Sequence, residues 1–188
     1  MKKSVYLDYA AATPIDKKVL SAMRPYFSEQ FFNPSALYLA SRAVKKALNN
    51  ARDIFALELA VRPTEIIFTA GGTEANNLAI RGVMEQFPDK KLLISAIEHE
   101  SIREPAELYD VHLVKVDTNG LLDIADFTKK LNDDTVLVSI IYANNEVGTI
   151  QNLKKISEII NNHKKGRSKR GIKPRCIFTL TLLRRYLT

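Results

Sequence analysis

Apolar and polar residues follow two recurring patterns along this chain. In residues 37–55, apolar side chains recur every three or four positions, which predicts a long amphipathic helix. Residues 135–143 instead form an almost continuous apolar run, which is typical of a strand buried on both faces. The two patterns divide the chain into helices and strands.

The chain begins with helices and then alternates strands with helices. Helices are predicted over residues 16–26, 37–55, 73–87, 102–108 (broken by Pro105), 124–131 and 153–163. Strands are predicted over residues 65–69, 91–97, 111–116 and 135–143, with a short extended stretch at residues 5–9. The alternation predicts an α/β domain with a mostly parallel sheet. In such sheets, ligands bind beyond the carboxyl ends of the strands.

Composition narrows the class of protein. The 188 residues are 46% hydrophobic, enough for a buried core. No run reaches the roughly 18 apolar residues of a membrane span. Asp8 and Tyr9 follow the N-terminal lysines, which is unlike a signal peptide. The single cysteine, Cys176, excludes an internal disulfide framework. We therefore expect a soluble cytoplasmic protein that does not contact membranes.

The formal net charge of +7 is unevenly distributed. Residues 1–153 carry 17 basic and 20 acidic side chains, whereas residues 154–188 carry 11 basic side chains and one acidic one, Glu158. Such a segment can attract nucleic acid. Because no aromatic residue interrupts the run 163–173 to stack on bases, the pattern favours a solvated lysine-rich loop instead.

Three polar clusters follow predicted strands. In residues 68–77, an apolar strand runs through Gly71 and Gly72 into a helix that begins near Thr73. Glycine lets the backbone approach a ligand, and free N–H groups at a helix start suit a phosphate. His99 follows the next strand, and an Asn-Asn-Glu sequence at residues 144–146 follows another. Each cluster alone also fits a structural turn, but three at one sheet edge predict a binding site.

Together with two earlier motifs, these clusters resemble the cysteine desulfurases, a branch of the class V aminotransferases. The resemblance covers residues 4 to about 174. It rests, in order, on residues 6–14 (YLDYAAATP), Asn33–Pro34–Ser35, residues 68–77 (FTAGGTEANN), Glu98–His99 and residues 144–151 (NNEVGTIQ). Five motifs in the family's order are specific where each alone is not.

The resemblance implies the aspartate aminotransferase-like fold of the pyridoxal-phosphate-dependent transferases. In this chain the fold would be incomplete. It implies that Gly72 and Thr73 hold the phosphate of pyridoxal 5'-phosphate. His99 would stack on the pyridine ring and move protons, and Asn145 would hydrogen-bond the ring's phenolic oxygen. Asn33 would contact the substrate carboxylate. No metal site is expected.

The family converts L-cysteine to L-alanine. It passes the sulfur as a persulfide to an acceptor or scaffold protein, for iron–sulfur clusters or tRNA thiolation, and its members are homodimers. The family's lysine that binds the cofactor covalently, its persulfide cysteine and its Phe-His-x-Asp-Ala-x-Gln-Ala motif have no match here. We therefore expect this chain to be inactive alone.

The expected organisation has three parts. Residues 1–15 form an arm that contributes to the small domain, residues 16–177 a partial cofactor-binding large domain, and residues 178–188 an out-of-frame tail. Shifting the reading frame of this tail by one base permits Phe-His-Thr-Asp-Ala-Ala-Gln-Ala, which predicts a frameshift near residues 174–177. On this hypothesis the tail is not the native strand, so its neighbour in the sheet loses a partner.

Other functions remain open on the sequence. A different class V enzyme, such as a selenocysteine lyase, fits the same motifs. A non-catalytic fragment that docks on a partner, or a pseudogene product, also fits a chain that lacks the lysine and the cysteine. A cysteine desulfurase is the leading hypothesis.

Overall fold

The structure is a computed structural model that describes the backbone of residues 5–9, 11–172 and 177–182, and the side chains of residues 5–9 and 11–172. The chain forms two compact units, Met1–Phe68 and Thr69–Thr188, and each is described by itself. Among the described residues, no helix is both long and apolar enough to cross a membrane.

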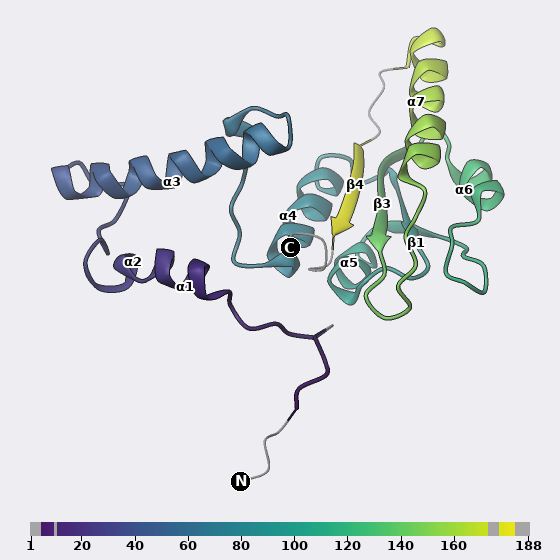
Figure 1. Cartoon of the computed structure of the whole chain (residues 1–188). Helices are drawn as coiled ribbons and strands as arrows, with labels where there is room; N and C mark the ends of the chain where they lie inside the picture. Colours follow the sequence, from purple (N-terminus) through teal and green to yellow (C-terminus); the bar gives the residue numbers. More distant parts are fainter. Residues whose placement is uncertain (1–4, 10, 173–176, 183–188) are drawn as a thin grey trace. The chain divides into compact units, whose positions relative to one another are not determined.

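The first unit is helical. Its elements are α1 (Lys17–Met23), α2 (Pro25–Ser28), α3 (Leu39–Glu58) and the 3₁₀ turn η1 (Pro63–Glu65) (Figure 1). Asp16 caps α1, because its carboxylate accepts the backbone N–H of Lys18 at 2.7 Å. The long helix predicted from its apolar spacing is therefore found as α3.

The prediction of a strand over residues 65–69 is wrong. Glu65 ends the 3₁₀ turn instead, and its carboxylate accepts the backbone N–H of Arg62 at 2.8 Å. Ile67 and Phe68 are 68% and 43% exposed. A strand needs a hydrogen-bonded neighbour, and residues 66–69 have none within the described part of the chain.

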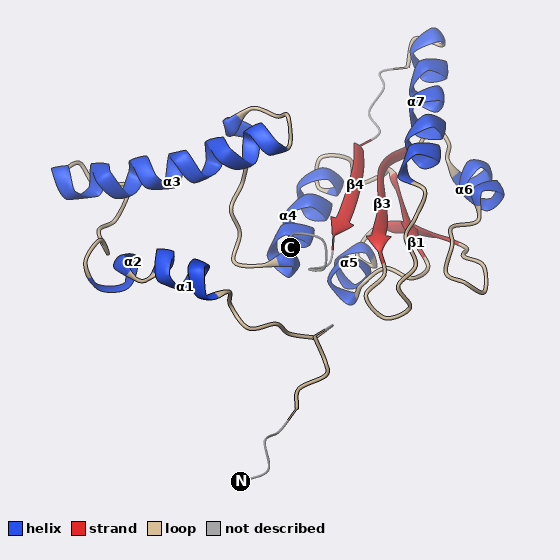
Figure 2. Cartoon of the chain, in the orientation of Figure 1, coloured by secondary structure: helices blue, strands red, loops and turns tan. Residues whose placement is uncertain are grey.

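The second unit alternates helices and strands, as predicted. Its elements are α4 (Gly72–Met84), β1 (Lys91–Ser95), α5 (Glu100–Ala106), β2 (Asp110–Val114), α6 (Ile124–Lys130), β3 (Thr135–Ala143), α7 (Leu153–Lys169) and β4 (Ile177–Leu182). Pro105 lies inside the last turn of α5, next to the helix end. The strands form one sheet in the order β2-β1-β3-β4, and every neighbouring pair is parallel (Figure 2). The mostly parallel sheet expected from the sequence is therefore present.

Helices cover both faces of this sheet. On one face, α6 and α7 pack side chains such as Phe127 and Ile156 against the strands. On the other face, α4 and α5 do the same, with Met84 fully buried. The neighbouring β1 residues Leu92 and Leu93 belong to opposite faces, as a pleated strand requires. This two-sided burial explains why the strands have continuous apolar runs.

The prediction that the tail leaves its sheet neighbour without a partner is also wrong. β4 pairs with β3 in parallel, in a register that begins at Leu137 opposite Ile177. The β-branched residues Ile177, Thr179 and Thr181 favour extended backbone, and the open edge of β3 offers the peptide groups to pair with it.

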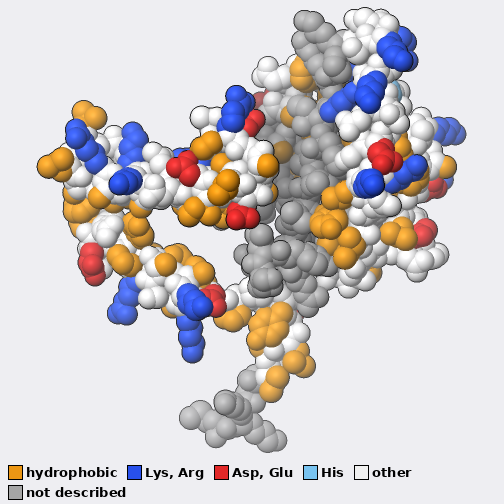
Figure 3. Space-filling view, turned by 45° about the horizontal axis from the view of Figure 1, so that its top comes forward, with side chains coloured by type: hydrophobic (Ala, Val, Ile, Leu, Met, Phe, Trp, Pro, Cys, Tyr) orange, Lys and Arg blue, Asp and Glu red, His pale blue; other side chains and the backbone are white. Residues whose placement is uncertain are grey.

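The lysine-rich segment is helical, which corrects the expectation of a solvated loop. α7 continues to Lys169, and basic side chains gather around its C-terminal end (Figure 3). The buried Arg167 donates to the carbonyl of Thr135 at 3.3 Å. Arg170 binds both carboxylate oxygens of Asp133, at 2.7 and 2.9 Å. Lysine and arginine are good helix formers, so the charge run extends the helix rather than ending it.

Candidate functional site

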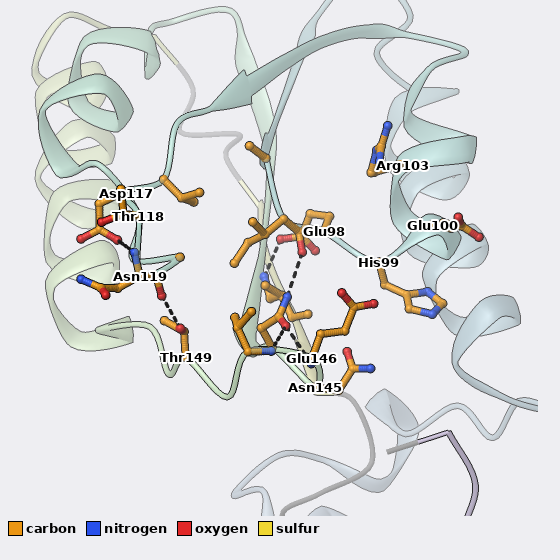
Figure 4. A pocket seen from close by; sticks show the side chains of 17 residues that line it. Glu98, His99, Glu100, Arg103, Asp117, Thr118, Asn119, Asn145, Glu146 and Thr149 are labelled. Atoms are coloured by element: carbon orange, nitrogen blue, oxygen red, sulfur yellow. Dashed lines mark hydrogen bonds between the residues drawn. The ribbon is translucent and has the colours of Figure 1, made fainter. Parts of the chain in front are cut away.

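The strand order places a change of direction between β1 and β3. From β1 the chain passes to β2 on one side, and the next crossover returns it to β3 on the other. In α/β sheets, ligands bind at such a switch point, beyond the carboxyl ends of the strands. A hollow of about 910 Å³ lies there, walled by residues 96–100, 116–120 and 144–147, with Arg103 and Thr149 (Figure 4).

His99 borders this hollow and a second one of about 550 Å³. The second hollow is also lined by Thr73, from the first turn of α4. His99 is the N-cap of α5, and its ring Nδ1 accepts the backbone N–H of Ser101 at 3.1 Å. The cap bond fixes the ring at the helix start, while the residue stays exposed to a ligand.

Glu98 is a buried carboxyl in the middle of the site. Figure 4 shows it between the turn that carries His99 and the loop after β2. Its Oε1 accepts the hydroxyl of Ser95 and the backbone N–H of Ile141, both at 2.5 Å, whereas Oε2 has no hydrogen-bond partner among the described residues. Burial raises the pKa of Glu98 from 4.5 to about 7, against the lowering effect of these bonds. The carboxyl thus links the end of β1 to β3.

The two asparagines after β3 have different environments. Asn144 builds the turn, because its side-chain oxygen accepts the backbone N–H groups of Glu146 and Val147 at 2.9 and 3.0 Å. Gly148 closes the turn with a φ of 77°, which favours glycine. Asn145 lines the hollow, and among the described residues no hydrogen bond uses its amide. Asn145 is therefore the one available to a ligand.

The first turn of α4 supplies the other polar groups. An α-helix offers no internal acceptor to its first N–H groups, which here include those of Gly72 and Thr73. Nearby, Glu74 accepts the backbone N–H of Ala70 at 2.6 Å, and Asn77 donates to the carbonyl of Thr73 at 2.9 Å. Apart from the adjacent residues and the backbone of α4 itself, no atom of the described residues would lie within 4 Å of a Cβ built on Gly72, so there is open space beside this turn.

Asn33 lies in the other compact unit, in a turn of its own. Its side-chain oxygen accepts the backbone N–H of Ser35 at 2.9 Å, and its carbonyl accepts that of Ala36 at 3.1 Å. The sequence-predicted site residues therefore divide between the units. His99 and Asn145 share one hollow, His99 and Thr73 share the next, and Gly72 adjoins Thr73 in the same turn.

The loop after β2 forms a wall of the hollow to which none of the sequence motifs assigns a residue. Asp117 accepts the backbone N–H groups of Asn119 and Leu121 at 2.8 and 2.9 Å. Thr149 donates its hydroxyl to the carbonyl of Asn119, which joins this loop to the turn after β3. The Asp-Thr-Asn-Gly sequence at residues 117–120 is a turn signal after a strand and could have identified the loop.

Comparison with known proteins gives the family. The family model described as Aminotransferase class-V matches residues 5–166. Cysteine desulfurase IscS of Dictyoglomus turgidum is 41% identical over 166 residues, which cover 85% of this chain and 42% of that protein. Putative cysteine desulfurase IscS 1 of Bacillus subtilis is 40% identical over 167 residues, which cover 85% of this chain and 44% of that protein.

Solved structures agree with this similarity. A NifS-like protein aligns with a TM-score of 0.87 and 30% identity, over 96% of this chain and 49% of that one. SspA in complex with cysteine aligns with a TM-score of 0.79 and 32% identity, over 94% of this chain and 50% of that one. The predicted fold class is confirmed, and the chain spans less than half the length of the curated relatives named above. From the family match over residues 5–166, the chain belongs to the class V aminotransferase family.

Proposed function

We propose that the two adjoining hollows bind pyridoxal 5'-phosphate, as part of a cysteine desulfurase. The observation that carries this proposal is the place of His99 on the border of both hollows. A ligand with an aromatic ring at one end and a phosphate at the other can then contact His99, Asn145 and the first turn of α4 together. When bound, the cofactor supplies an electron sink through its pyridine ring.

The available donors suit this group. Backbone N–H groups at the start of α4 and the hydroxyl of Thr73 are suited to a phosphate dianion. The amide of Asn145 is suited to the phenolic oxygen, and the exposed imidazole of His99 to stacking on the ring and moving a proton. Asn33 is proposed to contact the substrate carboxylate.

The substrate and partners are proposed from the relatives. Two of them are named as cysteine desulfurases, and the SspA structure contains cysteine, which favours L-cysteine over selenocysteine. We propose conversion to L-alanine in the cytoplasm, with the sulfur leaving as a persulfide to an acceptor or scaffold protein. Turnover is proposed for a homodimer that also holds the family's lysine and cysteine, not for this chain alone.

Binding of pyridoxine 5'-phosphate to the full chain tests the cofactor proposal. This analogue lacks the aldehyde, so it cannot react with the surface lysines. We expect it to bind at least about tenfold more tightly than pyridoxine, because hydrogen bonds to a charged group are worth about 1.5–3 kcal/mol. For the same reason, Thr73→Val is expected to weaken binding about tenfold in isothermal titration calorimetry.

Thr128→Val on α6 is the matched control, since Thr128 is exposed and its hydroxyl donates to the carbonyl of Ile124 in the same helix. It is expected to leave affinity unchanged. Equal affinities for pyridoxine and its phosphate, or a Thr73→Val chain that binds like wild type, would contradict the proposal.

A further inference from the structure

The ring nitrogen Nδ1 of His99 faces two groups of one residue. The backbone N–H of Ser101 points to it at 3.1 Å, and the hydroxyl oxygen of Ser101 lies 2.8 Å away. A backbone N–H can only donate. Nδ1 must therefore offer its lone pair, so in the neutral ring the proton is on Nε2.

The hydroxyl of Ser101 is oriented from its other side. The amide nitrogen of Asn76, on α4, donates to this oxygen at 2.8 Å. A hydroxyl has one hydrogen, and with the Asn76 donor occupying a lone pair, that hydrogen is left for Nδ1 of His99. Asn76 and Ser101 are only 7% and 9% exposed, so water competes little for these bonds.

We propose that Asn76 and Ser101 are positioning residues that hold neutral His99 with its proton on Nε2, so that the ring offers an N–H donor to a bound ligand. Among the described residues, no hydrogen bond uses Nε2 of His99. The identity of the ligand rests on the proposed function above, but the direction of the hydrogen bonds does not. Sequence motifs assigned a role to His99 and none to these two residues.

The same chain of bonds also ties the two ends of the proposed site together. Asn76 lies one helical turn after Thr73 on α4, and Ser101 lies in the first turn of α5, beside His99. A displacement of α4 relative to α5 would break the Asn76–Ser101 bond. The group proposed to bind phosphate and the ring proposed to stack on the cofactor are thus held at a fixed spacing.

The ¹⁵N signals of the imidazole ring test this inference without any ligand. In the wild-type chain, at a pH where His99 is neutral, we expect an unprotonated Nδ1 and a protonated Nε2. Asn76→Asp replaces the donor with an acceptor for the Ser101 hydroxyl, so both ring signals should move toward values averaged between the tautomers. Asn161→Asp is the matched control: it adds the same charge at an exposed position of α7, which covers the other face of the sheet, and should leave the ring signals unchanged.

A proton on Nδ1 in the wild-type chain would overturn the inference. This measurement uses the wild-type chain, so it does not depend on whether a variant folds. Ring signals that stay at wild-type values in a folded Asn76→Asp chain would also overturn it. Ser101→Ala, which adds no charge, is expected to weaken pyridoxine 5'-phosphate about fivefold, near the net worth of one hydrogen bond. If the tautomer is as expected and the analogue does not bind, the proposed function fails and the positioning role stands. If the analogue binds but the proton is on Nδ1, the positioning role fails and the proposed function stands.

Discussion

The second unit is expected to lose on the order of 3 kcal/mol of stability between pH 5 and pH 8, and Glu98 is expected to be the cause. Burial raises the pKa of this carboxyl from 4.5 to about 7 in the folded chain. Between these values the folded chain keeps a proton that the unfolded chain has released, so stability falls by about 1.4 kcal/mol per pH unit. The loss is complete above about pH 7, where both states are ionised.

Other titratable groups affect the stability in a different pH range or change it in the opposite direction. Asp126 and Asp134 have pKa values lowered chiefly by hydrogen bonds, from Lys115 and Lys90 respectively, so their effects fall in acid, below this window. Burial lowers the pKa of His163. The contribution of His163 to the stability of the folded chain therefore rises with pH up to about 6.5. The charged or titratable neighbours of Glu98 around the hollow are His99, Glu100, Arg103, Asp117 and Glu146.

Glu98→Gln isolates the effect. The glutamine cannot ionise, but its carbonyl can still accept the bonds from Ser95 and Ile141. We expect the variant to exceed wild type in stability at pH 8 and to lose this excess near pH 5. Urea unfolding, followed through the amide signals of β1 and β3, measures both chains. Glu100→Gln, on the exposed neighbour, should follow the wild-type profile. Parallel pH profiles for Glu98→Gln and wild type would show that the buried carboxyl does not titrate in this window.

Gln151→Ala is expected to destabilise the second unit by about 3 kcal/mol. The buried amide of Gln151 accepts the backbone N–H of Leu122 at 2.9 Å and donates to the carbonyl of Gly120 at 2.7 Å. Alanine would leave both backbone groups without a partner, and each buried unsatisfied group costs about 1–3 kcal/mol. Unfolding by urea measures the change.

Gln86→Ala provides the comparison, because Gln86 is exposed and follows the end of α4. Its effect should stay within about 0.5 kcal/mol. Gln151→Glu keeps the acceptor but not the donor, so it should recover little stability. If Gln151→Ala unfolds at the same urea concentration as Gln86→Ala, the two bonds do not hold the loop after β2.

Local pattern was enough to predict most of the second unit. The apolar run at β3 and the two glycines Gly71 and Gly72 at the start of α4 located the sheet and one end of the site. Elements whose boundaries depend on distant partners were less predictable. The charge run at residues 163–173 gives no sign that Arg167 bonds Thr135 or that Arg170 pairs with Asp133. These contacts hold α7 to the start of β3 and to the loop before it.

Site residues could be predicted where they belong to a recognised motif, but the separate role of each residue could not. The motif contains two adjacent asparagines, and only the fold shows that Asn144 builds the turn while Asn145 faces the hollow. Glu98 stood in a recognised pair without a role, because its raised pKa depends on burial by β3 residues far along the chain. The hydrogen bond from Asn76 to Ser101 likewise joins residues 25 positions apart.

Two hypotheses about the organisation of the chain stay predictions. One is the division at residues 15 and 177 into an arm, a partial large domain and a tail. The other is the frameshift near residues 174–177. Cys176 and residues 183–188 lie outside the described residues. Resequencing the codons from residue 165 onward tests the frameshift, since one added or removed base should restore Phe-His-Thr-Asp-Ala.

The central claim is that one ligand, pyridoxal 5'-phosphate, spans from the start of α4 to the turn after β3. Mapping of ¹H–¹⁵N shifts in the full chain during titration with pyridoxine 5'-phosphate tests it most directly. If the ligand spans these elements, saturable shifts with one dissociation constant are expected at the backbone amides of Gly72 and Thr73, the ring of His99 and the side-chain amide of Asn145. Shifts confined to the lysine-rich end of α7, or none at these four residues, would contradict it.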